Sequence, residues 1–252
     1  MSTLPVWLGQ TEGDLRRQIP VYINSFDQLT YLRDTVDWFV AHGFPNITVM
    51  DQGSTYAPLL DYLQSKAFPA TAQVLHFRNI GPRRAVRRAA MLTGLDRPFI
   101  FTDPDLELPA PPAEDFLTRL LTLGRRYNVV KVGLALDIHS RRVNADLPFG
   151  NPEQGFTIRS YYRRFFRHPL ERNVYHVGVD TTFFVYVPRP NPVAEDILSS
   201  QPRIPAVRVA GDGFLAQHRP WLFDNGMPAE EEAHYRTKTS IASTFFGRYA
   251  AE

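Results

Sequence analysis

Two acidic residues separated by a single position follow an apolar segment near the middle of the chain. The segment 98–102 is almost wholly apolar, and Asp103, Pro104 and Asp105 come directly after it. In extended backbone alternate side chains point the same way, so both carboxylates can face one ligand. Close carboxylates repel each other unless a cation or a donor lies between them, and oxygen ligands suit Mg²⁺ or Mn²⁺. The pair therefore predicts a divalent metal site that can bridge to phosphate oxygens.

Alternating strands and helices are expected to position this pair. Four short apolar segments predict strands at 19–23, 47–50, 74–77 and 98–102. The stretches between them predict helices at 29–40, 56–67 and 82–94. The apolar stripe of the first helix consists of Leu29, Leu32, Val36, Phe39 and Val40. Strands that alternate with helices indicate βαβ units, and hence an α/β fold with a mostly parallel central sheet flanked by helices.

Polar residues lie where these predicted strands end. Asn24 follows the first strand, Asp51 the second and Asn79 the third, and Asp103 opens the acidic cluster after the fourth. In open α/β sheets ligands bind beyond the carboxyl ends of the strands, so these residues are expected to form one site. The alternative is that Asn and Asp end strands simply because they favour turns.

The second half of the chain is less regular. A helix at 115–126 and strands at 129–136, 182–187 and 206–210 are expected, and a further helix is expected within 230–252. Residues 139–176 lose the alternation and become rich in Arg and aromatic residues. No repeat or long linker divides the chain, so we expect residues 1–252 to form one domain.

The region 19–107 resembles the nucleotide-binding half of a GT-A fold glycosyltransferase, similar to the family 2 enzymes that use nucleotide diphosphate sugars. The likeness is carried by the opening strand, the strand ending at Asp51, the Asn-Ile-Gly-Pro-Arg segment at 79–83, and the D-x-D of Asp103 and Asp105. The resemblance implies a Rossmann-like sandwich. It also implies a nucleotide-binding half over about 19–110 and a metal and acceptor half over about 111–252.

The resemblance further implies roles for these residues. Asp51 would contact the nucleotide base, while Asp103 and Asp105 would hold the ribose and the metal. Asn24 and Asn79 would position the nucleotide. Arg83 opens a basic cluster at the N-terminus of a predicted helix, where arginine and the helix terminus both favour phosphate. The remaining members of this cluster are Arg84, Arg87 and Arg88, and a solvated basic face is the alternative.

Three residues of the second half are further candidates. Members of the family often use a histidine late in the domain as a metal ligand, and His218 matches that position. A neutral imidazole can complete a carboxylate site; a packing histidine is the alternative. Asp180 would be the base of an inverting enzyme or would hold the sugar in a retaining one, and Asp137 is a weaker rival. The sequence leaves the stereochemical outcome open.

The segment 160–168 mixes Tyr, Phe and Arg. This composition suits a nucleic-acid, membrane-surface or glycan contact, and equally a loop whose aromatic rings pack onto the sheet. A closing lid is a further alternative.

Composition excludes several classes. The 252 residues contain no cysteine, which excludes disulfide scaffolds, thiol catalysis and cysteine-ligated zinc. The net charge of +2 is a weak signal for nucleic acid. No window approaches the ~18 apolar residues of a membrane span, and no secretion signal is recognised. We therefore expect a soluble, cytoplasmic protein, with peripheral membrane attachment through its acceptor as an open alternative.

Taken together, these features predict a metal-dependent glycosyltransferase. It would move a sugar from a nucleotide diphosphate sugar to a hydroxyl acceptor, with Mn²⁺ or Mg²⁺ as cofactor and a glycan or glycolipid, such as a surface polysaccharide, as acceptor. One alternative is a degenerate domain that only binds glycan or a partner. Another is a sugar nucleotidyltransferase, which would usually have a Gly-rich loop after the first strand, where this chain has none. Nucleic acid is not an expected partner.

Overall fold

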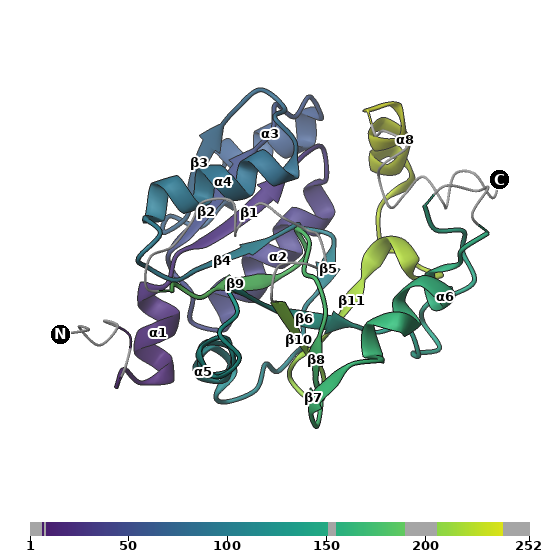
Figure 1. The fold of residues 1–252 in the computed structure, drawn as a ribbon. Helices are drawn as coiled ribbons and strands as arrows, with labels where there is room; N and C mark the ends of the chain where they lie inside the picture. Colours follow the sequence, from purple (N-terminus) through teal and green to yellow (C-terminus); the bar gives the residue numbers. More distant parts are fainter. Residues whose placement is uncertain (1–6, 8, 151–154, 190–205, 239–252) are drawn as a thin grey trace.

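The computed structural model describes residues 7, 9–150, 155–189 and 206–238, and a long twisted sheet runs through the middle of them (Figure 1). Across the described residues, its strand order is β3 (Gln73–His76), β2 (Ile47–Asp51), β1 (Val21–Ser25), β4 (Phe99–Thr102), β9 (Phe184–Tyr186), β6 (Lys131–Leu136), β10 (Ala206–Val209), β8 (Val174–His176) and β7 (Pro169–Glu171). Two short strands, β5 (Leu106–Glu107) and β11 (Leu215–His218), pair beside this path.

Most strands of the sheet run in one direction. β1 is parallel to β2 and β4, and β2 is parallel to β3. β9 is antiparallel to both β4 and β6, so β6 runs the same way as β4, and β10 is parallel to β6. The predicted α/β fold with a mostly parallel central sheet is therefore confirmed. The carboxyl ends of β1, β2, β4 and β6 all meet at one edge of the sheet.

Helices cover both faces of the sheet. The α-helices of the described residues are α1 (Glu12–Gln18), α2 (Leu29–Ala41), α3 (Ala57–Gln64), α4 (Pro82–Thr93), α5 (Phe116–Arg126), α6 (Ile158–Tyr162) and α8 (Ala229–Lys238). Alternation along β1 sends Val21 and Ile23 into the core under α2, α3 and α5, and sends Tyr22 into a second core under α4. Figure 1 shows α4 on one face and α2 and α3 on the other.

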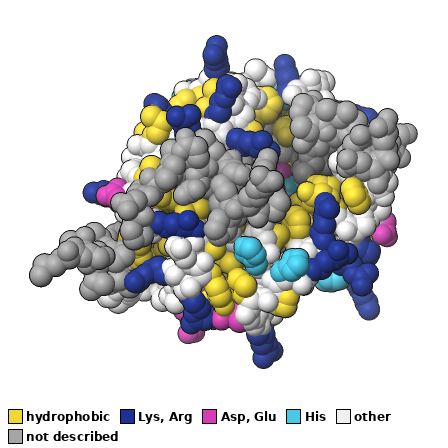
Figure 2. All heavy atoms as spheres, viewed as in Figure 1, with side chains coloured by type: hydrophobic (Ala, Val, Ile, Leu, Met, Phe, Trp, Pro, Cys, Tyr) yellow, Lys and Arg dark blue, Asp and Glu magenta, His cyan; other side chains and the backbone are white. Residues whose placement is uncertain are grey.

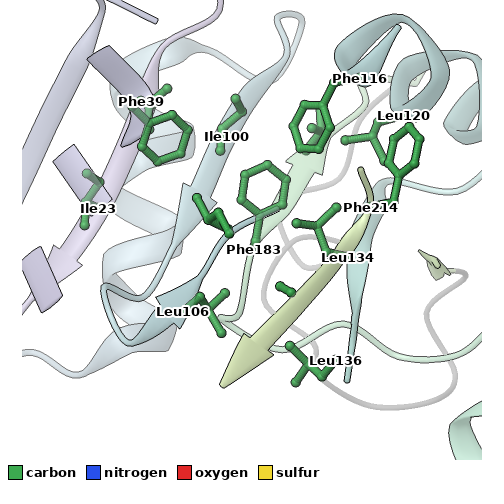
Figure 3. Packing of buried hydrophobic residues seen from close by; sticks show 14 of the residues in the cluster. Ile23, Phe39, Ile100, Leu106, Phe116, Leu120, Leu134, Leu136, Phe183 and Phe214 are labelled. Atoms are coloured by element: carbon green, nitrogen blue, oxygen red, sulfur yellow. The ribbon is translucent and has the colours of Figure 1, made fainter. Parts of the chain in front are cut away.

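Aromatic side chains join the helices to the sheet in the larger core. Phe183 stacks on Phe39 of α2 with ring centroids 6.4 Å apart, and it meets Phe116 of α5 edge-on at 5.6 Å (Figure 3). All three rings are fully buried. Phe183 lies three residues after Asp180, so this packing anchors the chain beside one of the predicted site residues.

The predicted apolar stripe of α2 is correct apart from one residue. Leu32, Val36 and Phe39 are fully buried, whereas Val40 is 45% exposed. The 3.6-residue period keeps positions three and four apart on one face, so Val40, next to Phe39, turns away from the sheet. Gly43, with a φ of 82°, follows the helix and takes the left-handed conformation that ends helices.

The structure adds elements that the sequence pattern did not predict. α1 begins at a capping box formed by Thr11 and Asp14. The irregular 139–176 stretch contains α6, the short 3₁₀-helix η2 (Arg163–Phe166) and the β7–β8 hairpin. The helix expected within 230–252 corresponds to α8, and residues 239–252 lie outside the described residues. None of the helices described here is long and apolar enough to cross a membrane.

Candidate active site

One cavity lies at the carboxyl edge of the sheet, where β1, β4 and β11 end. Its volume is about 460 Å³, within the range of small-molecule sites. Its lining consists of Asn24, Phe26, Gln28, Gln52, Asn79, Gly81, Pro82, Asp103, Pro104, Asp105, Tyr162, Asp180, Thr181, Thr182, His218, Tyr235 and Lys238. Three acidic side chains and a histidine thus share one wall with several amides.

A small antiparallel ladder brings the C-terminal histidine to the D-x-D segment. β5 follows Asp105 directly and pairs with β11, so that His218 lies opposite Leu106. The Arg219 N–H also donates to the Asp105 carbonyl oxygen at 2.9 Å. As a result His218 Nε2 lies 3.5 Å from Asp105 Oδ2, although 113 positions separate the two residues in the sequence (218 − 105).

Asp103 is held by two donors. Asn24 Nδ2 donates to its Oδ1 at 3.0 Å, and the Thr181 hydroxyl donates to its Oδ2 at 2.6 Å. Burial raises the pKa of Asp103 well above its ordinary value, and the neighbouring Asp105 carboxylate raises it further. The two hydrogen bonds oppose this shift by stabilising the charged form. Both oxygens of Asp103 therefore already have partners on the strand β1 and on the loop before β9.

Asp105 and His218 are buried with polar atoms that lack partners. Their side chains are 13% and 5% exposed. Asp105 Oδ1 and His218 Nδ1 find no hydrogen-bond partner among the described residues. Burial raises the pKa of Asp105 to about 7 and lowers that of His218 to about 3. Near neutral pH the histidine is consequently a neutral imidazole, stacked on Trp221 with ring centroids 4.4 Å apart.

This pair has the chemistry of a partial metal site. A divalent cation would offset the buried negative charge and supply a partner to the carboxylate, and a neutral imidazole is a common metal ligand. Within the described ranges, no group of three or more His, Asp or Glu side chains is close enough to hold a metal ion. Asp105 and His218 therefore fit as two protein ligands of a cation whose other ligands come from substrate or solvent. Asp103 would have to use the second lone pair of an oxygen to bind the ion directly, because each of its oxygens already accepts one hydrogen bond.

The third carboxylate, Asp180, is paired with a buried arginine. Arg208 Nη2 donates to Asp180 Oδ1 at 3.2 Å, and the Thr182 hydroxyl and N–H donate to the same oxygen at 2.6 and 3.1 Å. Burial would raise the pKa of Asp180, but the Arg208 guanidinium and the Thr182 hydrogen bonds outweigh it and lower the pKa overall. Asp180 remains 47% exposed on the cavity side, whereas the Arg208 side chain is only 4% exposed. The result is an ionised carboxylate of fixed orientation.

A glycine on β6 allows the Asp180 segment to approach the sheet. A Cβ at Gly133 would lie 2.8 Å from a methyl carbon of Val179 and 2.9 Å from the Phe183 carbonyl oxygen. Any larger residue would push this segment away from β6. The position of Asp180 thus depends on the close contact of Gly133 on β6 with Val179 and Phe183, which flank the Asp180 segment.

The predicted site residues fall into two groups. The first group lines the cavity: Asn24, Asn79, Asp103, Asp105, Asp180 and His218. Asp51 and Arg83 do not line it. The Asp51 carboxylate is buried and accepts from the Ser54 N–H at 3.2 Å, with His76 Nδ1 3.0 Å away. The rival Asp137 lines a separate cavity and binds the His139 and Ser140 N–H groups.

The basic cluster on α4 faces solvent. Its four arginines are exposed, and Figure 2 shows Lys and Arg side chains gathered over this helix. The helix begins at Gly81 and Pro82, which do line the cavity. The N-terminus of α4 therefore lies at the cavity, while the arginine side chains form a solvated face.

Several residues of the site were not predicted from the sequence. Arg208 lies between Val207 and Val209 on β10, and a lone charge inside an apolar strand is the signal that would have found it. Tyr162 is buried and lines the cavity from α6. Gln52 follows Asp51 and lines the cavity in its place; its Oε1 accepts from the Ile80 N–H at 3.1 Å.

Comparisons with known proteins found similarity in structure alone. No protein-family model matches the chain, and no curated protein sequence matches it. Among solved structures, the chain is similar to a mannosyltransferase from Pyrobaculum calidifontis in complex with GDP-Man and Mn²⁺, with 11% identity and a TM-score of 0.49 over 84% of this chain and 61% of the other. It is also similar to GalNAc-T7 with UDP, GalNAc and Mn²⁺, with 13% identity and a TM-score of 0.46 over 79% of this chain and 44% of the other.

A third similar structure belongs to HddC from Yersinia pseudotuberculosis complexed with GMP-PN. The identity is 10% and the TM-score 0.47, over 88% of this chain and the whole of the other. The chain thus spans less than two thirds of the first two structures.

We predict that Asp105→Asn stabilises the protein at high pH. In the folded protein the pKa of Asp105 is raised to about 7. At pH values above the ordinary pKa of an aspartate, the unfolded chain therefore binds fewer protons than the folded one, and stability falls as pH rises toward 7. The neutral amide removes this loss. Denaturant unfolding should show a gain of about 1–3 kcal/mol at about pH 8, shrinking toward about pH 4.

The difference between wild type and Asp105→Asn isolates Asp105. The lowered pKa of His218 makes stability rise with pH, which is opposite to the effect of Asp105, but His218 is present in both proteins. Asp61→Asn, which changes an exposed carboxylate on α3, is the charge-matched control and should bring no such gain. An Asp105→Asn protein whose advantage over wild type does not grow with pH would contradict the account of this buried carboxylate.

Proposed function

We propose that the chain is a metal-dependent glycosyltransferase that moves a sugar from a nucleotide diphosphate sugar to a hydroxyl acceptor. The observation that carries the proposal is the buried pair of Asp105 and the neutral His218, each with an unpartnered polar atom, in a cavity that also holds Asp103 and Asp180. A divalent cation would supply a partner to both unpartnered atoms. A substrate that shares such a cation with the protein is one that offers phosphate oxygens.

Asp105 and His218 are the residues that would hold Mn²⁺ or Mg²⁺. Bound there, the ion would act as a Lewis acid that neutralises charge developing on the leaving diphosphate. Asp103 lies two residues away and is fixed by Asn24 and Thr181. We assign Asp103 to the hydroxyls of the ribose and, more weakly, to the metal, because both of its oxygens already accept hydrogen bonds in this structure.

The first half of the chain supplies the nucleotide side of the cavity. Asn24 lines it from the end of β1, and Asn79 from the loop after β3. The assignment of Asp51 to the base and of Arg83 to the diphosphate stays a prediction, since neither lines the cavity. Gln52, the neighbour of Asp51, is a further candidate for contact with the base. The metal and acceptor side comes from the second half, through Asp180 and His218.

Asp180 is the carboxylate we assign to the reacting sugar or the acceptor hydroxyl. A general base works best when its pKa lies near the working pH, whereas Arg208 and Thr182 lower the pKa of Asp180. This environment favours accepting a hydrogen bond from a hydroxyl over taking up its proton. A glycan or glycolipid is the acceptor class proposed here.

The test of the proposed function is turnover. The protein should be incubated with UDP-, GDP-, CDP-, ADP- and dTDP-sugars, with Mn²⁺ and with a chelator, and release of the nucleoside diphosphate measured. We expect one base to be preferred, with release abolished by the chelator. Asp105→Asn should lower turnover by about 100-fold or more, the usual scale for removing a group that stabilises the transition state.

Asp61→Asn is the matched control, because it makes the same change at an exposed carboxylate on α3 that does not line the cavity; its turnover should remain close to wild type. Release of pyrophosphate from a nucleoside triphosphate and a sugar phosphate would instead indicate a nucleotidyltransferase. Binding without turnover of any donor would support the degenerate binding domain and refute the proposal.

Thr182→Val provides a separate test of Asp180. The substitution is close to isosteric, keeps Arg208 and removes the 2.6 Å hydrogen bond to Asp180. Loss of this bond raises the pKa of Asp180, so the acid limb of the pH–rate profile should move to higher pH, with about a tenfold loss of turnover. Metal-dependent binding of the nucleoside diphosphate should persist. An unchanged acid limb would remove Asp180 from the reaction.

A further inference from the structure

The surface formed by η2 and the β7–β8 hairpin is rich in exposed basic residues, four of them arginines. We define this basic face by Arg163, Arg164, Arg167, His168, Arg172 and His176, all of which are exposed. Figure 2 shows dark blue and cyan side chains gathered near η2 and α6, with hydrophobic atoms between them. The same stretch contains a single acidic residue, Glu171, which binds Arg126 at 2.7 Å and lies 3.6 Å from Arg119. The face therefore carries a strong net positive charge.

Backbone pairing and ring contacts make this face one continuous surface. Pro169 pairs with Tyr175 across the hairpin, and the His176 N–H donates to the His168 carbonyl oxygen at 2.9 Å. Phe166 of η2 meets Tyr175 of β8 edge-on with ring centroids 5.0 Å apart. Tyr175 therefore faces η2, and the arginines of η2 and of the hairpin turn belong to one supported segment of the chain.

Apolar groups lie among these basic residues. Leu170 is 42% exposed, and Phe165 and Phe166, which precede it on η2, are half-buried. Exposed arginine combined with partly buried aromatic and aliphatic side chains is the composition of surfaces that lie on anionic bilayers. The aromatic rings are engaged with one another rather than presented flat to solvent: Tyr162 and Phe165, for example, meet at 67°. Single-stranded nucleic acid needs free ring faces on which bases stack.

The basic face adjoins the acceptor side of the cavity. Tyr162, which lines the cavity, directly precedes Arg163. Phe165 lies under the Arg208 guanidinium, with 5.8 Å from the guanidinium carbon to the ring centroid, and Arg208 binds Asp180. A surface docked on this face would therefore lie a short way from the carboxylate assigned to the acceptor.

We propose that this basic face docks the protein on anionic membrane, so that the acceptor is presented from the bilayer surface as a lipid-linked hydroxyl compound. The lipid-linked acceptor rests on the proposed function, while the docking itself does not. The positive charge of the face favours an anionic membrane as its partner, because the phosphate headgroups of the lipids are negatively charged. Each arginine near such a surface strengthens attachment, and the attraction weakens as salt screens it.

The experiment is co-sedimentation of the full chain with vesicles, in the absence of nucleotide. Vesicles of phosphatidylcholine alone are compared with phosphatidylcholine mixed with phosphatidylglycerol, at low and high salt. We expect binding to the anionic vesicles alone, and its loss at high salt. The triple variant Arg163→Gln, Arg167→Gln, Arg172→Gln should bind at least about tenfold more weakly. Arg164 is retained because it donates to the Tyr161 carbonyl oxygen and covers that ring.

The matched control is Lys66→Gln, Arg97→Gln, Arg125→Gln, which removes three exposed cations elsewhere on the protein and should bind vesicles as wild type does. Equal loss in both variants would reduce the effect to net charge and overturn the proposal. So would equal binding to neutral vesicles, or binding to a single-stranded oligonucleotide in preference to anionic vesicles. Circular dichroism checks that the variants fold, and the wild-type dependence on lipid and salt tests the proposal without them.

Failure here is distinguishable from failure of the proposed function. Vesicle binding is measured without a donor, and donor turnover is measured without vesicles. A protein that turns over a nucleotide sugar but ignores anionic vesicles would overturn the docking face alone. A protein that binds anionic vesicles but turns over no donor would leave the docking face supported and the transferase refuted.

Discussion

The pairing of β5 with β11 is the constraint on which the site depends. Two short strands, far apart in the sequence, lock His218 against Leu106 and tie the Arg219 N–H to the Asp105 carbonyl oxygen. An acid and a histidine are thereby buried together, and burial moves the pKa of each toward its neutral form. This arrangement is the basis of the proposal that Asp105 and His218 bind a cation. The same burial lowers the stability of the protein at neutral pH, as expected for a functional site.

Opposite charge environments divide the carboxylates of the cavity. Among the described residues, no guanidinium is hydrogen-bonded to the Asp105 carboxylate, and burial raises its pKa. Asp180 is paired with the buried Arg208, and its pKa is lowered. Titratable groups whose environments push their pKa values apart typically have different roles. The division matches a cation-binding role for Asp105 and a hydrogen-bonding role toward a hydroxyl for Asp180. The Arg208 guanidinium beside Asp180 also lies over the Phe165 ring of η2, which is part of the segment that carries the basic face.

The sequence predicted the sheet better than the site. Apolar segments with helices between them predicted β1 to β4, because β1, β2 and β4 are largely buried and the helices between them bury apolar residues on one face. The D-x-D pair could be found because an apolar strand leads directly into it. The β5–β11 ladder could not, since strands of two and four residues carry no periodicity and their pairing depends on the whole fold. Arg208 and Tyr162 were missed because residues in apolar or irregular segments gain their roles only through distant neighbours.

The most direct measurement is electron paramagnetic resonance of Mn²⁺ titrated into the protein together with UDP or GDP. We expect the wild-type protein to bind Mn²⁺, and so to lower the concentration of free Mn²⁺, in the presence of one nucleoside diphosphate. His218→Gln, which takes away one of the two buried ligands, should weaken this binding by about tenfold or more. His234→Gln, on α8, should not, because that histidine does not line the cavity. Equal depletion of free Mn²⁺ by wild type and His218→Gln would contradict the central claim that the β5–β11 ladder assembles a metal site.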